Sequence, residues 1–439
     1  MRRRATANRY RADSGSGQDF DTLIAEQRRK PMVTRTQPGT ESTQGRTPGT
    51  DRTSQLYPLG LVEFVLMARR SGAVDLATGV PSFPAPPRAL LDGACEAILH
   101  GNNQYDDPAG NDRLRAAAAA LHGADPDTEI TVTGGSTEGL NTALQALVQP
   151  GDEVVVIEPF FEAYPSAIRL AGAVPRFVRL REPHWRWRPE ELEAAFGPRT
   201  RAVVVNSPHN PTGRVLDAAE LSAVLELCER WNAVVISDEV YAELVDRPED
   251  LVLPGDLPGA ADRVVALRSL SKSHAVSGWR IGWIYAPASL TRTFRMIHET
   301  FTAGVAAPLQ AAAVQILRDS PRWTQEQRTV LTRNRARIVA ALREVGLQCD
   351  QPQGSAFLLA RLPDELEEDS MAFARRIIAE IGVSGAPGGL FYSPSRDGAR
   401  HLRFGYNKAE PVISAAIERL GGLRAPGAPA PARGGAAAR

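Results

Sequence analysis

Short apolar runs alternate with helical stretches over residues 128–283, and this alternation constrains the fold more than any other feature of the chain. The runs are rich in β-branched residues, which is typical of strands buried on both faces of a sheet. They occupy residues 130–133, 153–157, 202–205, 233–237 and 264–267. The pattern predicts an α/β fold with a largely parallel sheet.

Composition agrees with a globular enzyme, since 43% of the 439 residues are hydrophobic and 23% are charged. No apolar run reaches the roughly 18 to 20 residues that span a bilayer, and the basic start lacks the apolar segment of a secretory signal. Cys95, Cys228 and Cys349 are far apart and show no metal-ligand spacing. We therefore expect reduced cysteines, no metal site, no membrane association and a cytoplasmic location.

The two ends of the chain differ from the middle. Residues 1–54 contain few apolar positions and carry 11 Lys and Arg against 6 Asp and Glu, which predicts a disordered basic extension. Residues 424–439 are a low-complexity Ala, Pro, Gly and Arg tail, for which we also expect disorder. Between them we expect a large domain over 99–315 and a smaller domain formed by 55–98 together with 316–423.

One lysine lies in an unusual setting, in the stretch Ser-Leu-Ser-Lys-Ser-His-Ala-Val-Ser-Gly-Trp-Arg-Ile-Gly-Trp at 269–283. Partial burial beside a cation such as Arg280 lowers the pKa of a lysine and exposes a nucleophilic amine. Lys272 can therefore form a Schiff base with an aldehyde cofactor, while Ser269 and Arg280 hold its phosphate. The alternative is a surface lysine in a polar loop.

Further polar residues follow the other apolar runs, where ligands of parallel sheets bind. Gly135, Ser136 and Thr137 lie at a strand-to-helix turn whose free N–H groups suit an anion, although Ser and Thr also begin ordinary helices. Asn210 lies in a turn fixed by Pro and Gly and can point its amide at a ligand. Asp238 ends a valine-rich run and needs a cation such as a protonated pyridine nitrogen, unless it faces water.

The lysine stretch closely resembles the cofactor motif of the class I/II aminotransferases, which are fold-type-I enzymes that use pyridoxal 5'-phosphate. Other segments resemble the family in the right order from residue 74 to residue 406. The resemblance implies that Asp238 holds the pyridine proton, that Asn210 and Tyr241 bond the phenolic oxygen, and that Phe161 stacks on the ring. For Phe161, core packing is the alternative.

The resemblance also implies substrate contacts and a homodimer with active sites at the subunit interface. Gly79 matches the glycine of the family's substrate-facing loop, and Arg403 matches the arginine that binds the substrate α-carboxylate. Tyr105 matches a tyrosine that reaches the cofactor phosphate of the other subunit. The alternatives are a locally packed turn tyrosine and a surface arginine.

We therefore expect an enzyme that moves an amino group from an amino acid to a 2-oxo acid by a ping-pong mechanism. Within the family the chain resembles the kynurenine, methionine and arginine–pyruvate transaminases. Phe161 is typical of the kynurenine type, and the lysine stretch resembles that of the arginine–pyruvate type. Residues 300–308, which we expect to face the substrate, contain no arginine for a distal carboxylate, so we expect neutral, aromatic or basic donors. His298 and Glu299 could form an anionic wall for a guanidinium, although Glu299 suits a solvated helix face equally.

Two other functions use the same residues. β-Elimination, decarboxylation or oxygen-dependent oxidation would follow if a different substrate bond stood perpendicular to the ring. A transcription regulator with an aminotransferase-like domain is more remote, because residues 1–54 show no helix-turn-helix pattern. We therefore expect no nucleic-acid partner.

Overall fold

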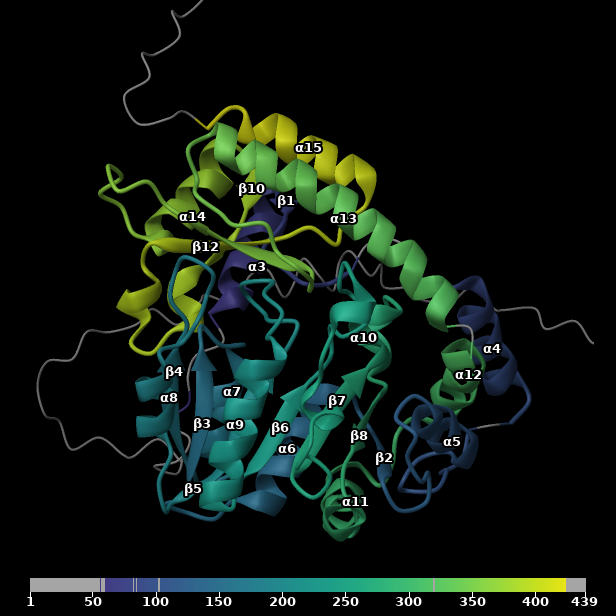
Figure 1. Ribbon diagram of the computed structural model, residues 1–439. Coiled ribbons are helices and arrows are strands. Elements are labelled where there is room, and N and C mark those ends of the chain that lie inside the picture. Colours follow the sequence, from purple (N-terminus) through teal and green to yellow (C-terminus); the bar gives the residue numbers. More distant parts are fainter. Residues whose placement is uncertain are drawn as a thin grey trace, which may run out of the picture. The chain divides into compact units, whose positions relative to one another are not determined.

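The computed structural model in Figure 1 describes residues 56, 60–81, 83, 85–101, 103–318 and 320–423. All of these residues fall within one unit, Thr50–Arg439. Residues 1–54 and 424–439 lie outside the described ranges, so the disorder predicted for them stays a prediction.

A seven-stranded sheet forms the centre of this unit, with the order β2-β8-β7-β6-β5-β3-β4 (Figure 1). Neighbouring strands are parallel except that β8 runs antiparallel to both β2 and β7. The predicted α/β fold with a largely parallel sheet is confirmed. In chain order the strands are β2 Ile130–Thr133, β3 Glu153–Glu158, β4 Val174–Arg179, β5 Thr200–Asn206, β6 Val234–Asp238, β7 Val264–Ser269 and β8 Gly282–Tyr285.

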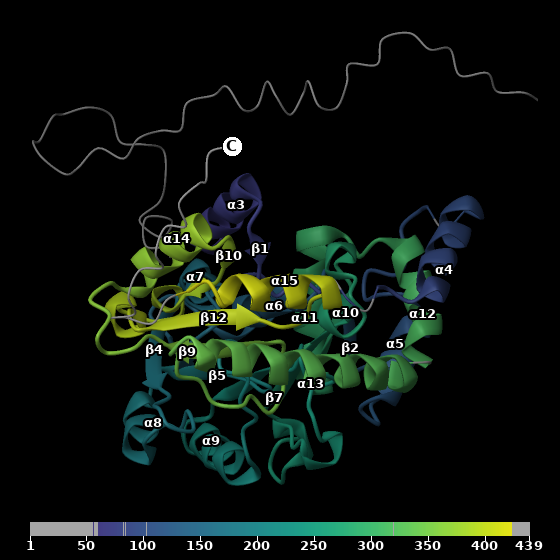
Figure 2. The same ribbon diagram turned by 90° about the horizontal axis from the view of Figure 1, so that it is seen from above.

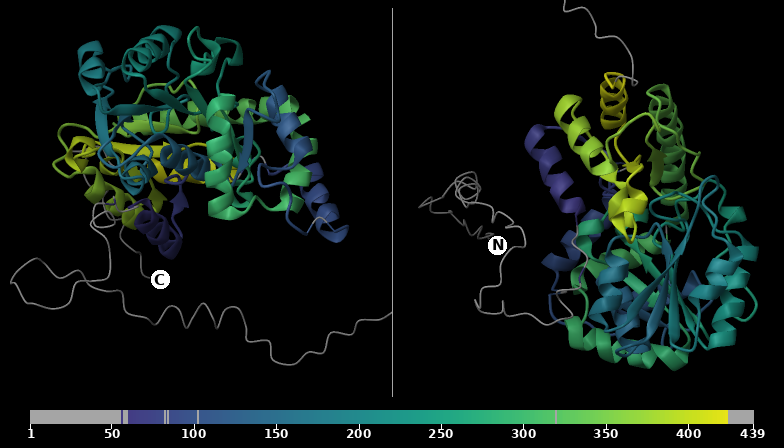
Figure 3. Two further views of the ribbon diagram at one scale, coloured as in Figure 1. Left: turned by 90° about the horizontal axis from the view of Figure 1, so that it is seen from below. Right: turned by 90° about the vertical axis from the view of Figure 1, so that its left-hand side faces the viewer.

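Alternate residues of the central strands pack into two different hydrophobic clusters, one on each face of the sheet. Val155 and Val203 face α8 (Pro189–Ala195) and α9 (Ala218–Trp231). Their neighbours in the strands face α6 (Ser136–Leu147), α7 (Ala163–Leu170) and α11 (Ala288–Thr302). The view from the side of β4 shows helices on both sides of the sheet (Figure 3, right). Burial on both faces explains why the strands read as continuous apolar runs.

The β2 edge of the sheet is covered by three further helices, α4 (Arg88–Leu99), α5 (Asp112–Ala120) and α12 (Ala307–Arg318). Leu90 and Ala94 of α4 share a cluster with Ile130 and Val132 of β2. We had expected the helix near residues 88–98 to belong to the smaller domain. Its apolar face instead packs with the large sheet.

The smaller part contains two short sheets and four helices, with α13 and α15 packed side by side (Figure 2). Phe64, Leu76, Phe357 and Ile413 belong to its core. Its strands are β1 Val74–Asp75, β9 Phe357–Arg361, β10 Val383–Ser384, β11 Ala386–Pro387 and β12 His401–Gly405. Its helices are α3 Leu61–Ser71, α13 Ser320–Glu344, α14 Ser370–Glu380 and α15 Glu410–Leu420.

The long helical region expected over 289–345 is divided into α11, α12 and α13. α11 ends where Ala303 and Gly304 adopt left-handed backbone angles, with φ of 55° and 121°. A short helix, α10 (Leu270–Ser273), follows β7 and carries Lys272. This helix, the start of α6 and the end of β6 all border one cavity, to which β12 of the smaller part also contributes.

Candidate active site

One cavity of about 260 Å³ is lined by ten of the thirteen residues that the sequence singled out. These residues come from turns and strand ends that are far apart in the chain, which is the arrangement predicted for a parallel sheet. The ten are Gly79, Ser136, Thr137, Phe161, Asn210, Asp238, Tyr241, Lys272, Arg280 and Arg403. Gly135, Ser269 and Tyr105 do not line the cavity.

Lys272 reaches the cavity from α10, a helix of four residues. The Ser269 hydroxyl accepts the backbone N–H of Ser271 at 3.1 Å and so caps this helix. The amine of Lys272 donates to the Gly79 carbonyl at 3.1 Å. Burial, together with the nearby charges of Arg403, Arg280 and Lys408, lowers the pKa of Lys272 to about 8. Far more of the amine is therefore unprotonated near neutral pH than for an exposed lysine.

Asp238 ends β6 with its carboxylate buried. The Tyr164 hydroxyl donates to its Oδ2 at 2.6 Å, and the Val240 N–H donates to its Oδ1 at 3.3 Å. Burial raises the pKa of Asp238 to about 6 in spite of these donors. A carboxylate in this state gains most from a cationic partner that is buried with it.

The N-terminus of α6 forms an anion cradle with Arg280. The first N–H groups of a helix lack partners within the helix, and the N-cap residue Gly135 offers no side-chain cap. Gly135 has a φ of 86°, and a Cβ there would lie 2.6 Å from Nη2 of Arg280. Glycine is therefore required for this arginine to approach the helix start.

The hydroxyl that joins this cradle differs from the one expected. The Ser269 hydroxyl donates to the Ile281 carbonyl at 3.0 Å and does not reach the cavity wall. Ser271 lies on the wall instead, with its hydroxyl 3.4 Å from Nη1 of Arg280. The first serine of a Ser-x-Ser-Lys turn is the helix cap, and that signal in the sequence could have shifted the prediction to Ser271.

Arg403 lies on β12 with its guanidinium buried. It donates to Oδ1 of Asn210 at 2.8 Å and to the Ala77 carbonyl at 2.7 Å, while its Nε has no partner among the described residues. Phe357 lies 4.0 Å from the guanidinium carbon on one side and Phe391 4.7 Å from it. Burial lowers the pKa of Arg403 to about 10. Neutral oxygens and an unpaired Nε leave this cation ready for a carboxylate.

Two residues that the sequence analysis did not single out hold the site together. Asn206 donates to the Asp238 carbonyl at 2.8 Å and accepts the Asn210 N–H at 2.8 Å, which joins the ends of β5 and β6. Tyr164 contacts Asp238 as described, and its ring meets that of Phe161 edge to face with centroids 5.5 Å apart. Asn206 lies four residues before Asn210 and Tyr164 three residues after Phe161, but their hydrogen-bond partners are set by tertiary packing.

Glu162 contributes a second carboxylate to the cavity wall. Burial raises its pKa, which Arg403 and the Leu61 N–H partly offset. Its Oε2 is buried without a hydrogen-bond partner among the described residues.

The proposed wall of His298 and Glu299 does not form in the described part of the chain. His298 is buried against Glu138 of α6, with Nδ1 3.0 Å from Oε1. Glu299 is exposed, and neither these two residues nor 300–308 line the cavity. Within one chain the segment does not reach the cavity, and Glu299 lies on the solvated face of α11, which was the alternative, because α11 turns its apolar side chains and His298 toward α6.

Tyr105 is also outside the cavity, with 87% of its surface exposed.

Within the described ranges, the helices lack any apolar stretch of the length and hydropathy that a membrane span requires.

The family model "Aminotransferase class I and II" matches residues 71–420. A probable N-succinyldiaminopimelate aminotransferase of Mycobacterium tuberculosis is 37% identical over 388 residues, which cover 84% of this chain and 97% of the relative. The Escherichia coli methionine aminotransferase is 33% identical over 378 residues, with coverage of 84% and 97%. The solved N-succinyldiaminopimelate aminotransferase of M. tuberculosis superposes with a TM-score of 0.81 at 35% identity, covering 85% of this chain and all of that one.

Proposed function

Because the chain belongs to the class I and II aminotransferases and is itself an aminotransferase, we propose that it uses pyridoxal 5'-phosphate bound at Lys272 and prefers donors with neutral, aromatic or basic side chains. The observation that carries the cofactor proposal is the set of groups around one cavity. An anion cradle, a buried carboxylate and a lysine amine with a lowered pKa meet there.

These residues fit the chemical groups of the cofactor. A phosphate dianion would satisfy the free N–H groups of Ser136 and Thr137 and the charge of Arg280, with Ser271 adding a hydroxyl. A protonated pyridine nitrogen would give Asp238 the cation that its raised pKa shows it lacks. Asn210 and Tyr241 would bond the phenolic oxygen, and Phe161 would cover one face of the ring.

The reaction places different demands on the residues of the chain. The bound cofactor would supply an aldehyde for Lys272 and a protonated ring that withdraws electrons from the substrate Cα. The Lys272 amine would remove the Cα proton, which its lowered pKa favours near neutral pH. Arg403 would exchange the Ala77 carbonyl for the substrate carboxylate and fix the donor's orientation.

The cavity wall favours donors without a distal carboxylate. Among its described residues the basic side chains are Lys272, Arg280 and Arg403, all of which have roles at the cofactor or the α-carboxylate. The remaining wall includes Leu61, Val80 and the carboxylate of Glu162, whose Oε2 has no hydrogen-bond partner among the described residues. A buried distal carboxylate would therefore lack a partner and meet a like charge. Among the names of the relatives, methionine agrees with this preference, whereas N-succinyldiaminopimelate and aspartate each carry a distal carboxylate.

Trapping of the cofactor tests the proposal directly. Borohydride reduction followed by peptide mass spectrometry should find a pyridoxyl group on Lys272, and Lys272→Ala should lose it. A label that persists at wild-type level in the variant would contradict the assignment. With pyruvate as acceptor, the kcat/KM values of phenylalanine, methionine and arginine should exceed that of aspartate.

We further propose that the enzyme is a cytoplasmic homodimer in which Tyr105 reaches the partner's cofactor phosphate. The exposure of Tyr105 supports the dimer, and the free cysteines suit a reducing compartment. Hybrids of Tyr105→Phe with Lys272→Ala subunits test this arrangement. If Tyr105 acts across the interface, each hybrid has one intact site and activity is partly restored. If activity is not restored, Tyr105 does not act across the interface.

A further inference from the structure

Lysine is almost absent from this chain. Of its 51 basic residues, only Lys30, Lys272 and Lys408 are lysines, and the other 48 are arginines. Lys30 lies outside the described residues, and Lys272 and Lys408 lie within them. A chain that uses arginine so generally retains lysine at two internal positions, which points to a chemical need for an ammonium group at each. Lys272 has such a need, and Lys408 has no role in the reaction described above.

The Lys408 side chain is only 5% exposed, although it carries a charge. Its amine donates to the Thr78 hydroxyl and to the Val80 carbonyl, each at 3.1 Å, and lies 3.8 Å from Oδ2 of Asp75. The Thr78 hydroxyl and Oδ2 of Asp75 lie side by side, because they are hydrogen-bonded to each other, and the Val80 carbonyl is a separate acceptor. An ammonium can donate to the hydroxyl and to the carbonyl while its charge stays compact beside the carboxylate, whereas the planar fork of a guanidinium is larger and directs its donors into one plane.

The segment that Lys408 holds, residues 77–80, carries the substrate-facing Gly79. Its carbonyls are bonded by side chains of the β12 region: Arg403 binds that of Ala77 at 2.7 Å, and Asn407 binds that of Gly79 at 3.1 Å. The Gly79 carbonyl also accepts from Lys272 at 3.1 Å. No side chain fits at position 79, because a Cβ there would lie 2.2 Å from Cζ of Phe357.

The Asp75 carboxylate fixes the start of the segment by accepting hydrogen bonds from it. Its Oδ1 accepts the N–H groups of Ala77 and Thr78 at 2.9 and 3.0 Å, and its Oδ2 accepts the Thr78 hydroxyl. Lys408 therefore neutralises the carboxylate that shapes the turn and bonds the two sides of the turn itself. When a substrate carboxylate takes Arg403 away from the Ala77 carbonyl, Lys408 and Asn407 would keep the segment in place.

We propose that Lys408 is a positioning residue of the active site: its ammonium holds residues 77–80 against Lys272 and Arg403, and its charge keeps the Lys272 amine reactive. The proposal deepens the proposed function and rests on the role of Lys272 given there. The charged and titratable groups that act on Lys272 are Arg403 from β12, Arg280 after α10, Lys408 after β12 and Asp238 from β6. Three of them are cations that disfavour a protonated amine, and only Asp238 opposes them.

Two measurements separate the effect of the hydrogen bonds of Lys408 on residues 77–80 from the effect of its charge on Lys272. The first is steady-state kinetics of the holoenzyme with methionine and pyruvate. The second is competitive acetylation of the cofactor-free enzyme across pH, read by mass spectrometry on the Lys272 peptide, which is unambiguous in a chain with three lysines. In wild type, the midpoint of Lys272 reactivity should lie at about 8.

Lys408→Met should alter both readouts, because it removes the donors and the charge. KM for the donor should rise about tenfold, the factor that corresponds to one lost hydrogen bond from a charged donor, and the Lys272 midpoint should move to higher pH. Lys408→Arg should keep the midpoint near that of wild type but leave KM raised. Thr78→Val removes the hydroxyl that accepts from Lys408 but keeps the charge of Lys408. It should raise KM and leave the Lys272 midpoint unchanged.

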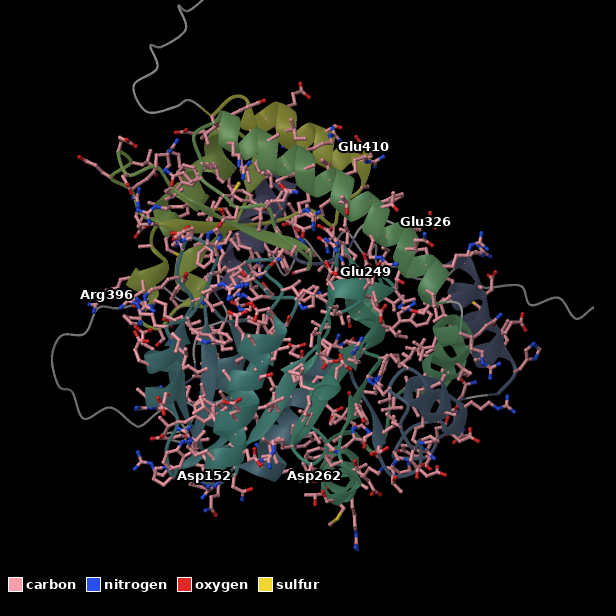
Figure 4. All side chains as sticks on the ribbon, in the orientation of Figure 1. Asp152, Glu249, Asp262, Glu326, Arg396 and Glu410 are labelled. Atoms are coloured by element: carbon pink, nitrogen blue, oxygen red, sulfur yellow. The ribbon has the colours of Figure 1, made fainter. Side chains whose placement is uncertain are left out.

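Arg333→Met serves as the matched control, because it removes one positive charge from an exposed ion pair between α13 and α15, whose other member is Glu410. Figure 4 labels Glu410, at the start of α15. It should change neither readout. Lys408→Met with a wild-type KM and midpoint would overturn the proposal, even if the variant melted at a lower temperature. Full rescue of KM by Lys408→Arg would overturn the requirement for an ammonium. Borohydride trapping at Lys272 separates these failures from a failure of the proposed function.

Discussion

The two walls of the cavity are built in different ways. The sheet wall consists of Ser136, Asn210, Asp238 and Lys272, which lie at helix starts and strand ends of the seven-stranded sheet. The small-sheet wall consists of Thr78, Gly79, Val80, Phe357 and Arg403, from the smaller part of the chain. Main-chain geometry places the first wall, since parallel strands bring their carboxyl ends to one edge. Bonds from charged side chains to carbonyl oxygens place the second.

This difference in construction matches a difference in demand. The sheet wall offers fixed electrostatic partners for a group that stays bound: a cradle for an anion and a carboxylate for a cation. On the small-sheet wall, Arg403 is bound to neutral oxygens that a substrate carboxylate can displace. We therefore expect substitutions in the sheet wall to remove chemistry, and substitutions in the small-sheet wall mainly to weaken donor binding.

Asp238→Asn should have the largest effect and would sharpen the comparison most. Transamination should fall by about a hundredfold or more, because the ring nitrogen loses its ionic partner. The stability of the cofactor-free enzyme should change in the opposite direction. In the folded state burial raises the pKa of Asp238 to about 6, against 3.8 for an exposed aspartate. The folded state therefore binds the proton more tightly than the unfolded state does. Folding stability is then highest at low pH and falls as pH rises from 4 to 6, by about 3 kcal/mol.

Thermal melts of the cofactor-free proteins measure this opposition. At pH 7.5, Asp238→Asn should melt at a higher temperature than wild type, and the difference should shrink as the pH is lowered through 6 toward 4.5. A variant that transaminates normally, or one that is less stable than wild type at every pH, would show that Asp238 is not the electrostatic partner that the sheet wall supplies.

Arg403→Ala should have the next largest effect, and on binding more than on chemistry. Loss of a buried cation that pairs with a carboxylate costs about 2 to 5 kcal/mol, so kcat/KM for the donor should fall by about a hundredfold. Most of the loss should be in KM, while borohydride still traps the cofactor on Lys272. Arg403→Lys should recover part of the activity. A fall in kcat with KM unchanged would break the division between the two walls.

The two walls also differ in how far the sequence predicts them. The fold and the sheet wall could be predicted because apolar runs locate the strands and polar residues directly follow them, as with Asp238 after 234–237. Which of two neighbouring serines faces the cavity could not, because Ser269 is used as a helix cap. The break of the 289–345 helix depends on the positive φ of Ala303, which residue type does not indicate.

For the small-sheet wall, the sequence predicted single residues and not their partners. Arg403 was predicted, but its bond to Asn210 joins residues 193 apart in the chain. Lys408 was missed, since a lysine after a short strand is normally solvated and only the closure of residues 75–80 over it buries the charge. The rarity of lysine in the chain was the one local signal available.

Glu162→Gln should have the smallest effect, a change of several-fold in donor preference. The carboxylate lines the cavity near Arg403 with a buried, unpaired Oε2, and so repels a donor with a distal carboxylate. Glutamine keeps the shape and can still accept the Leu61 N–H, but it removes the charge. The ratio of kcat/KM for aspartate to that for methionine should rise, mainly through aspartate. Burial raises the pKa of Glu162, so in wild type the same ratio should rise as the pH falls, whereas in the variant that pH dependence should be lost.

Glu299→Gln is the matched control, because this exposed residue lies outside the active-site cavity and should leave the ratio unchanged. If Glu299→Gln alters the ratio and Glu162→Gln does not, donor preference is set by a segment that does not line the active-site cavity within one chain, and the two-wall description of the site is incomplete.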